Sequence, residues 1–382
     1  MTEIAIIGAG IHPFGRHEGT TALAMGAHAV RAALADAGLR WSEVEFAYGG
    51  SEDGGNADTL VSELGPTGLP FTNVKNGCAT GGSSLVAAVR ALESGAYEVG
   101  VVVGFDKHPR GAFQNDPVAW SLPAWYGEDG LMVTTQFFGA KLQRYMYDHG
   151  LTATTLAQVA EKAFQNGALT PHAWRRTPMT VEQILGSPML AHPLTQYMLC
   201  SPGEGAAALV VCRREVLERL PDARPIWLRA VSFRTRRPGS FEVFSPSLEL
   251  EIAPSPTVDA AHEAFELAGI APADVDVVQV QDTESGAELI HLAECGLCEH
   301  GEQSELYAAG ATRINGRLPV NTDGGCLANG EPVGASGLRQ VYEIVAQLRG
   351  EAGERQVPGQ PRVGFTHVYG APGVSACTVL AR

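Results

Sequence analysis

Apolar residues in this chain fall into short continuous runs, separated by longer stretches with helical spacing. A short apolar run is typical of a fully buried strand, whereas repeats at i, i+4 and i+7 are typical of an amphipathic helix. Leu85, Val89 and Leu92 follow the helical spacing, and Gly95 behind them is a stop signal. We therefore expect an α/β protein. Strands are expected at 4–10, 45–48, 99–104, 226–231 and 275–280, with further helices at 21–37, 257–267 and 338–348.

Two parts of the chain repeat one order of elements: a strand, a glycine-rich junction, a packed helix and a second strand. Residues 73–95 and 321–350 are the counterparts, and each ends at a glycine that follows an amphipathic helix. We interpret the repeat as a divergent internal duplication with a period far above that of solenoids. The expected domains are residues 1–220 and residues 221–382.

Residues 105–200 lack a steady alternation of strands and helices and are rich in aromatic side chains. A long insertion of this kind is often a cover over an active site. Each aromatic residue on its own fits local core packing equally well. We expect this segment to be an inserted loop domain of the first half.

Composition excludes several classes of partner. The net charge of −15 argues against nucleic acid and against an anionic membrane surface. Apolar runs are shorter than a membrane span needs, and the first residues do not resemble a signal peptide. Seven scattered cysteines, an odd number, fit reduced thiols in the cytoplasm better than a disulfide framework.

Cys78 is the first candidate for chemistry, because it lies between glycines where a strand-like run gives way to a helix. The positive end of a helix dipole favours a thiolate, and the free N–H groups there can receive an oxyanion. A cysteine is more often an inert packing residue. The local pattern alone leaves these two interpretations about even.

The segment Asn76-Gly-Cys-Ala-Thr-Gly-Gly-Ser-Ser-Leu85 resembles the nucleophile segment of thiolases, above all those of the sterol-carrier-protein type. The resemblance covers nearly the whole chain, with several motifs in the expected order. It implies the thiolase fold, in which two duplicated βαβαβαββ halves form a five-layer α-β-α-β-α sandwich. A loop domain inserted in the first half then lies over the acyl-CoA site.

The resemblance also implies roles for individual residues. Cys78 would carry the acyl group. Thr366-His-Val-Tyr-Gly370 resembles the His-Asn-x-Gly pattern of the sterol-carrier branch, which makes His367 the best candidate base. The N–H groups of Gly370 and Cys78 would be oxyanion donors. Tyr369 is a candidate phenolic acid or base for an aldol cleavage.

Two motifs depart from the family. The usual Gly-His-Pro is here Gly330-Glu-Pro332, and the usual His-Asp-x-Phe is Gln281-Asp-Thr-Glu284. An ionised Glu331 beside the thiol would raise the cysteine pKa, or would act as a base toward carbon or CoA. Gln281 can hydrogen-bond an oxyanion or a water but cannot be a base. Asp282 remains a further candidate.

The expected function is CoA-dependent thiolytic cleavage of a bulky β-ketoacyl-CoA, with coenzyme A as co-substrate and no bound cofactor. The missing histidines leave open a retro-aldol lyase acting on a β-hydroxyacyl-CoA, and a non-catalytic acyl-CoA-binding subunit. Cys295 and Cys298 have CxxC spacing, but they match a thiolase loop that needs no metal, so we expect no zinc. The resemblance implies a homodimer and a small OB-fold/zinc-ribbon partner.

Overall fold

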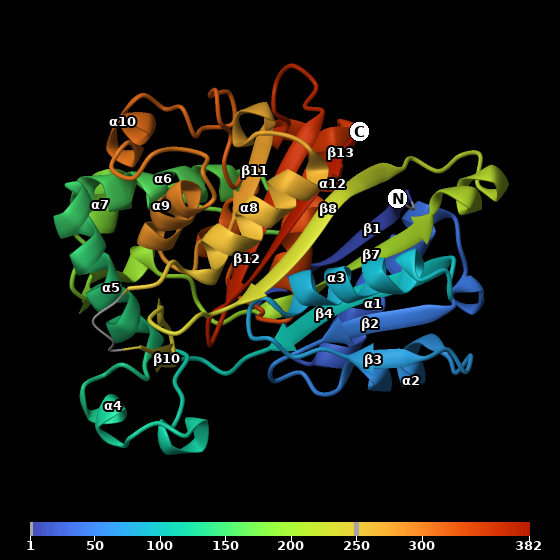
Figure 1. Cartoon of the computed structure of the whole chain (residues 1–382), viewed down its shortest axis with the longest axis horizontal. Coiled ribbons are helices and arrows are strands. Elements are labelled where there is room, and N and C mark those ends of the chain that lie inside the picture. Colours follow the sequence, from blue (N-terminus) through green and yellow to red (C-terminus); the bar gives the residue numbers. More distant parts are fainter. Residues whose placement is uncertain (1–2, 248–251) are drawn as a thin grey trace.

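The computed structural model describes residues 3–247 and 252–382, and within them nine strands form one mixed sheet. The strand order is β3-β2-β4-β7-β1-β8-β13-β12-β11 (Figure 1). The two halves of the sheet meet in the middle, where β1 and β8 pair through Ala5 with Trp227 and Ile6 with Ile226. The strands are β1 (Ile4–Gly15), β2 (Phe46–Gly50), β3 (Phe71–Asn73), β4 (Val99–Lys107), β7 (Glu204–Arg213), β8 (Ile226–Thr235), β11 (Val277–Val280), β12 (Val363–Gly370) and β13 (Val374–Ala381).

The two half-sheets repeat one topology. In the first half, β2 pairs in parallel with both β3 and β4, and β4 and β1 flank the antiparallel β7. In the second half, β11 pairs in parallel with β12, and β12 and β8 flank the antiparallel β13. The counterpart of β3 is reduced to a single parallel bridge between Val278 and Val320. The duplication predicted from the sequence is thus visible in the pairing of the strands.

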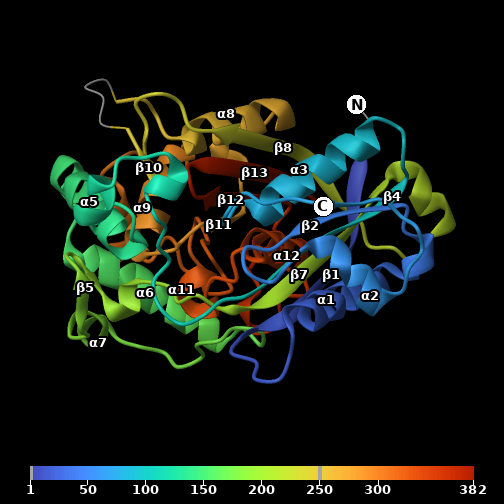
Figure 2. The same ribbon diagram turned by 90° about the horizontal axis from the view of Figure 1, so that it is seen from below.

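Helices complete five layers. α3 (Thr80–Glu93) contacts β2 and β4 on one side and β8 and β13 on the other. α12 (Ser336–Arg349) likewise contacts β11 and β12 of its own half and β1 and β7 of the first. α1 (Ala22–Ala37) covers the outer face of the first half-sheet, and α8 (Pro256–Ala268) covers that of the second (Figures 1 and 2). The predicted α-β-α-β-α arrangement is confirmed.

The sequence accounts for these helices. Thr21 caps α1 by accepting the N–H of Ala24 at 3.1 Å, and Gly38 ends it with a φ of 67°. The apolar positions predicted for α3 are all buried. On α12 even Arg339 and Glu343 are buried, because this helix has a half-sheet on each side. A central-layer helix therefore needs internal partners for its polar side chains.

The insertion lies over one end of the second half-sheet. Its α5 (Thr134–His149) and α6 (Ala153–Ala168) are the longest helices described in it, and α6 packs against α9, α10 and α11 of the second half. The shorter elements of the chain are α2 (Val61–Leu64), α4 (Trp125–Glu128), α7 (Val181–Leu185), α9 (Ser285–Glu294), α10 (Gln303–Ala308), α11 (Gly325–Asn329), β5 (Met189–Ala191), β6 (Leu194–Thr195), β9 (Phe241–Glu242) and β10 (Ser245–Pro246).

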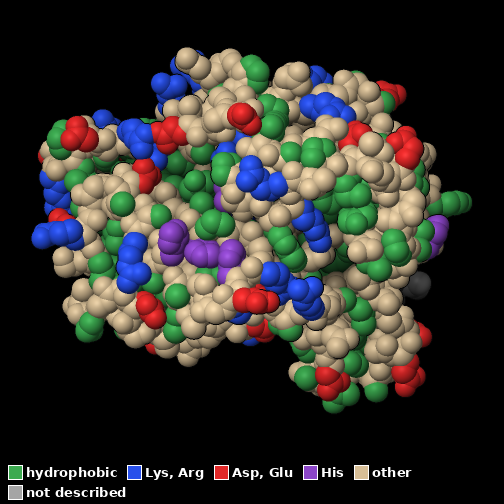
Figure 3. Space-filling view, turned by 180° about the vertical axis from the view of Figure 1, so that it is seen from behind, with side chains coloured by type: hydrophobic (Ala, Val, Ile, Leu, Met, Phe, Trp, Pro, Cys, Tyr) green, Lys and Arg blue, Asp and Glu red, His purple; other side chains and the backbone are tan. Residues whose placement is uncertain are grey.

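The surface carries charges of both signs. On the back face, Lys and Arg side chains are interspersed with Asp and Glu, beside a row of histidines (Figure 3). The rings of His12, His17 and His28 form one such cluster, with centroids 4.6 and 5.2 Å from that of His12. Among the described residues, no helix is both long enough and apolar enough to cross a membrane.

Candidate active site

A cavity of about 470 Å³ opens where the two halves and the insertion meet. Cys78 belongs to its wall, at the junction that leads into α3. Tyr369 and Ala371 enter from the end of β12, in the second half. The insertion and the β9–β10 hairpin contribute most of the aromatic wall, namely Phe113, Trp120, Phe138 and Phe244.

The junction that carries Cys78 is a tight turn between strand and helix. The N–H of Asn76 donates to Oγ1 of Thr80 at 2.9 Å, and Gly77 has a φ of 53°. A Cβ atom at Gly77 would lie 2.7 Å from the carbonyl oxygen of Ala371, so only glycine fits here. The close approach brings the end of β12 against the cysteine.

Glu331 influences the thiol of Cys78. The charge of the fully buried Glu331 carboxylate acts on the Cys78 thiol and raises its pKa. Nε2 of Gln281 donates to both carboxylate oxygens at 3.1 Å, and Oγ of Ser336 donates to one of them at 2.8 Å. Among the described residues, Glu331 has no cationic partner. Neutral donors alone therefore hold this carboxylate.

This pairing controls the state of the cysteine. Burial of the sulfur raises the pKa of the Cys78 thiol well above its usual value, and the charge of Glu331 raises the pKa further. Cys78 is therefore held as a thiol at rest, and not as a thiolate beside a cation. This arrangement is compatible with transfer of the thiol proton to a neighbouring base during attack.

Backbone contacts with the first half fix the loop that carries Glu331. The N–H of Glu331 donates to the carbonyl of Ser201 at 2.9 Å, and that of Gly334 donates to Oδ2 of Asp106 at 2.7 Å. Nε2 of His108 accepts the N–H of Val333 at 3.1 Å. Two buried polar side chains at the C-terminal end of β4, Asp106 and His108, therefore hold the loop.

Glycines allow this loop to reach the first half-sheet. A Cβ atom at Gly104 would lie 1.8 Å from the carbonyl oxygen of Gly334, and one at Gly334 would lie 2.5 Å from that of Gly50. Three backbones thus touch where a side chain on any of them would separate them. The contact sets how close Glu331 lies to Cys78.

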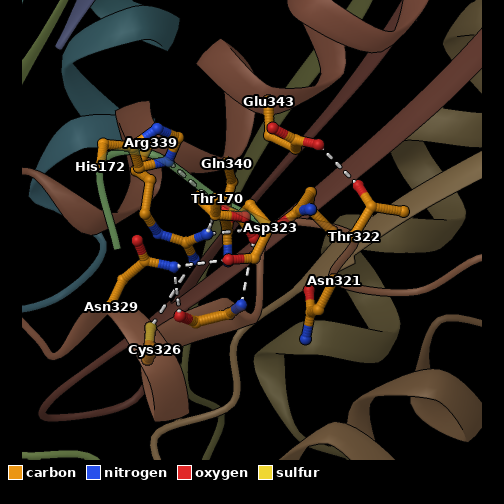
Figure 4. A network of polar contacts seen from close by, with 12 residues as sticks. Thr170, His172, Asn321, Thr322, Asp323, Cys326, Asn329, Arg339, Gln340 and Glu343 are labelled. Atoms are coloured by element: carbon orange, nitrogen blue, oxygen red, sulfur yellow. Dashed lines mark hydrogen bonds and ion pairs between the residues drawn. The ribbon is translucent and has the colours of Figure 1, made fainter. Parts of the chain in front are cut away.

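A buried polar network supports the same loop from behind (Figure 4). Arg339 of α12 forms an ion pair with Asp323, and both side chains are fully buried. Nδ2 of Asn329 donates to the carbonyl of Asp323 at 3.0 Å. Burial alone would raise the pKa of Asp323, but the charges of Arg339 and His172 lower it below its usual value. The network ties α11 to α12 on either side of Glu331.

Asp282 belongs to this scaffold. Its carboxylate accepts the N–H of Cys326 at 2.6 Å and that of Leu327 at 3.3 Å, at the start of α11. Burial raises the pKa of Asp282 well above its usual value, and the nearby charge of Glu288 adds to the effect. The structure therefore brings Gln281 to Glu331 but turns its neighbour Asp282 toward the helix that precedes the loop.

His367 lies on the face of β12 that packs against α8 and α9. Its Nε2 is 3.0 Å from Oγ1 of Thr257, and its ring centroid is 4.5 Å from that of His291. His367 does not line the Cys78 cavity. We expected its ring to lie beside the thiol, and no contact between the two is found among the described residues. Because Val368 faces α3, strand alternation turns His367 toward α8 and α9, on the face that Tyr369 shares. Tyr369 lies two residues further along β12 and lines the cavity, and His367 does not. Burial lowers the pKa of His367 well below its usual value, so the ring stays neutral.

Tyr369 and Gly370 do reach the cavity region. Oη of Tyr369 donates to Oε2 of the buried Glu242 at 2.5 Å. Burial and the Glu242 charge raise the pKa of Tyr369 well above its usual value, so its proton is retained. A Cβ atom at Gly370 would lie 2.4 Å from the carbonyl oxygen of Asn76. The backbone at Gly370 therefore packs directly on the Cys78 turn.

Comparison with known families gives two matches. Residues 4–183 match the family model described as thiolase, N-terminal domain, and residues 246–382 match the thiolase C-terminal domain-like model. The chain belongs to the thiolase family. The predicted family and the acyltransferase class of enzyme are confirmed at this level.

Thiolase relatives span almost the whole chain. An acetyl-CoA acetyltransferase of Methanothermobacter thermautotrophicus is 32% identical over 98% of this chain and 98% of that protein. The benzoylsuccinyl-CoA thiolase subunit BbsB of Thauera aromatica is 32% identical over 96% of this chain and 94% of that protein. Sterol carrier protein 2 of Oryctolagus cuniculus is 29% identical over 99% of this chain and 72% of that protein.

Solved thiolase-fold structures agree with the predicted fold. The Ltp2–ChsH2(DUF35) aldolase superposes with a TM-score of 0.87 at 25% identity, covering 99% of this chain and 97% of that chain. Human mitochondrial 3-ketoacyl-CoA thiolase superposes with a TM-score of 0.74, covering 100% of this chain and 98% of that chain. At 15% identity, this second likeness concerns the fold alone.

The thiolase motifs did not point to every residue of the site. Asp106 is the next-to-last residue of β4 and His108 follows that strand, and a polar cluster at a strand end is a usable signal. Ser336 lies in the matched glycine-rich segment but carries no motif of its own. Glu242 ends the two-residue strand β9, where the sequence shows no periodicity. Its contact with Tyr369 could be recognised only from the structure.

Proposed function

We propose that this chain catalyses CoA-dependent thiolytic cleavage of a β-ketoacyl-CoA through an acyl-enzyme on Cys78. The observation that carries the proposal is the buried Glu331 carboxylate beside the Cys78 thiol, whose pKa it raises, at an aromatic-lined cavity. A nucleophile with a base near it, and with that base oriented by further donors, is the arrangement that covalent catalysis requires.

In the first half-reaction the sulfur of Cys78 attacks the β-keto carbonyl while Glu331 takes the thiol proton. The carbon–carbon bond then breaks, leaving the acyl group on sulfur and an acyl-CoA carbanion. Glu331 returns its proton to that carbanion, so the carboxylate is regenerated. We assign the oxyanion donors to the N–H groups of Cys78 and Gly370, because the Gly370 backbone packs on the Cys78 turn.

In the second half-reaction coenzyme A is the co-substrate. Its thiol gives a proton to Glu331 and attacks the thioester on Cys78, which releases a second acyl-CoA. The departing Cys78 sulfur then takes the proton back from Glu331. Gln281 and Ser336 keep the carboxylate in place through both steps. The scheme requires no bound cofactor or metal.

The cavity supports a bulky acyl group. Its volume is about 470 Å³, and aromatic rings from three separate segments form much of its wall. Aromatic walls suit flat or branched apolar groups, because each ring presents a large rigid surface. We therefore propose a branched, aromatic or polycyclic acyl chain as the substrate.

The direct test mixes the purified protein with a β-ketoacyl-CoA and coenzyme A. Two acyl-CoA products are expected, together with an intact-mass increase on Cys78 when CoA is omitted. Cys78→Ala should abolish both signals while it leaves the melting temperature close to that of the wild type. Unchanged turnover in the folded Cys78→Ala protein would sink the proposal.

A second candidate is retro-aldol cleavage of a β-hydroxyacyl-CoA. It is favoured by the Tyr369–Glu242 pair at the same cavity, since a phenol backed by a carboxylate can relay the hydroxyl proton. The similar structure named as an aldolase adds support. Such a reaction would release a free ketone or aldehyde and would not consume CoA.

We also propose a homodimer and a small OB-fold/zinc-ribbon partner that covers the cavity mouth. Val118, Trp120 and Trp125 are exposed apolar side chains of the insertion, and Trp120 lines the cavity. One relative is named as a subunit, and one similar structure is a complex with a DUF35 protein. Light scattering of the purified chain tests the dimer. Co-purification with the product of a neighbouring gene tests the partner.

The remaining alternative, a non-catalytic acyl-CoA-binding subunit, is open to a separate test. Iodoacetamide should alkylate Cys78 because its sulfur reaches the cavity, and a bound acyl-CoA should slow the reaction. A Cys78 thiol inert to alkylation at pH 9 would favour the binding role. The seven cysteines are free thiols, which fits the proposed cytoplasmic location.

A further inference from the structure

A second cavity, of about 380 Å³, adjoins the one that holds Cys78. The two cavities share Phe113, Thr134 and Thr283 as common wall. Beyond that wall the second cavity is lined mostly by apolar or small side chains, among them Leu190, Leu199 and Cys200. It is therefore a natural continuation for a chain that starts at the Cys78 sulfur.

Arg175 is the only charged residue that lines this second cavity, among the described residues. Its Nη1 donates to the carbonyl of Leu327 at 2.8 Å, and its Nη2 donates to Oγ of Ser201. A guanidinium has five N–H donors, so three of them have no protein partner in the part of the chain described. Partial burial lowers the pKa of Arg175.

The absence of a counter-ion sets Arg175 apart from other buried or partly buried arginines of the described chain. Arg339 pairs with Asp323, Arg355 pairs with Glu343 at 2.9 Å, and Arg349 pairs with Asp36 at 2.7 Å. Arg175 has no carboxylate within ion-pair distance in residues 3–247 or 252–382, although the protein carries 42 acidic residues. The ring of Trp174 lies beside it, with its centroid 5.2 Å away. A half-buried cation without an anion, at the wall of a cavity, is available to an anionic ligand.

Hydrogen bonds also connect Arg175 to the loop that carries Glu331. Its backbone N–H donates to Ala328 at 2.9 Å, just before the Glu331 loop. Its side-chain partner Ser201 accepts the backbone N–H of Glu331 through its carbonyl. The guanidinium therefore belongs to the second cavity, whereas Lys75 and Glu52 line the first.

From these observations we propose that Arg175 binds a carboxylate on the acyl portion of the substrate, so that the enzyme acts on acyl-CoAs with an anionic group remote from the thioester. The inference rests on the proposed function for the placement of the carbonyl at Cys78. An arginine fork matches a carboxylate through two parallel hydrogen bonds, which gives both affinity and orientation. The CoA phosphates are the other anionic source, and the experiment separates the two.

Binding is measured first, in the Cys78→Ala background, so that the result does not depend on turnover. Adipyl-CoA and its methyl ester differ only in the terminal charge. Titration calorimetry should give at least a tenfold tighter Kd for adipyl-CoA, and Arg175→Met should remove this preference. Arg176→Met is the matched control, because that neighbouring arginine is exposed and should leave both Kd values unchanged.

Each outcome supports or overturns the proposed carboxylate site at Arg175. An equal loss of affinity for both ligands in Arg175→Met would mean a CoA phosphate contact and overturn the proposal, as would equal binding of the two ligands by the Cys78→Ala protein. Arg175→Lys, which keeps the charge, should recover part of the preference if the site is an anion site. If the carboxylate preference is present while thiolysis is not detected, the proposed reaction fails and the subsite stands.

Discussion

The carboxylate of Glu331 acts on the thiol of Cys78 and raises the pKa of the sulfur. Elsewhere a nucleophilic cysteine is commonly activated by a cation that lowers its pKa. In the proposed mechanism the base is instead a carboxylate that only neutral donors hold in place. Under that proposal the thiol loses its proton only when it attacks a carbonyl.

Replacing Glu331 should make the Cys78 thiol more reactive toward alkylation while it lowers thiolytic turnover. Glu331→Gln removes both the base and the nearby charge, so the pKa of Cys78 should fall and its thiolate fraction should rise. Iodoacetamide alkylation near pH 8 is expected to become several-fold faster, while thiolytic kcat falls by about 10² or more. Glu52→Gln is the control, because Glu52 makes the smallest contribution to the raised Cys78 pKa. Slower alkylation in Glu331→Gln would contradict the assignment.

The Tyr369–Glu242 contact distinguishes the two candidate reactions. If the enzyme is a thiolase, Tyr369→Phe should keep most of its thiolytic kcat, because the phenol lies outside the Cys78–Glu331 pair. If it is a retro-aldolase, Tyr369→Phe should lower ketone release by about 10² or more, whereas Cys78→Ala should have little effect. Chromatography of the CoA products, with and without added CoA, reads out both reactions. Glu242→Gln should follow Tyr369→Phe in either case.

His367 should affect stability at acid pH more than it affects turnover. Its pKa in the folded protein lies well below 6.5, so the unfolded chain binds the extra proton first as the pH falls. The stability that the neutral ring contributes is fully present above about pH 6.5 and is lost progressively below it. The difference in unfolding free energy between wild type and His367→Gln should therefore change by up to about 1.4 kcal/mol per pH unit below pH 6.5.

Denaturant unfolding between pH 4.5 and 8 measures that difference. Other buried groups titrate in both proteins and largely cancel in the comparison. His262→Gln, the same substitution at an exposed position, is the control. If instead His367→Gln loses thiolytic turnover by 10² with unchanged stability, the ring acts in catalysis and the motif-based expectation was sound.

The Arg339–Asp323 pair should matter far more than a surface pair. Arg339→Met leaves Asp323 buried and uncompensated, which should lower the unfolding free energy by about 3–5 kcal/mol. Arg144→Ala breaks an exposed i,i+4 pair with Asp148 and should cost about 0.5 kcal/mol or less. Adding Asp323→Asn to Arg339→Met should recover part of the loss. Equal effects of the two single variants in denaturant unfolding would be evidence against the buried network.

The layered fold could be predicted because its signals are local. Apolar spacing on α3 and α12, and glycines at Gly38, Gly95 and Gly350, mark helices that the structure contains. The repeat of a glycine-rich junction before each central helix was enough to suggest the duplication. Family motifs then added the order of strands, which periodicity alone does not determine.

The details of the site were harder to predict, because they depend on which face of an element a residue occupies. A motif match placed His367 near the cysteine, but it did not show how far along β12 the cavity begins. Tyr369 reaches the cavity from the same face, and His367, two residues earlier, contacts Thr257 instead. Glu331 and Gln281 were singled out as departures, although their contact with each other joins segments 50 residues apart. Arg175 could not be identified, since nothing local to it differs from any other surface arginine.

The contact among Gly50, Gly104 and Gly334 has a consequence for the proposed reaction. The proposed nucleophile and base come from opposite repeats and are brought together only where those repeats touch. Either repeat alone would therefore carry only half of the proposed chemistry, and the reaction would depend on the seam between the two.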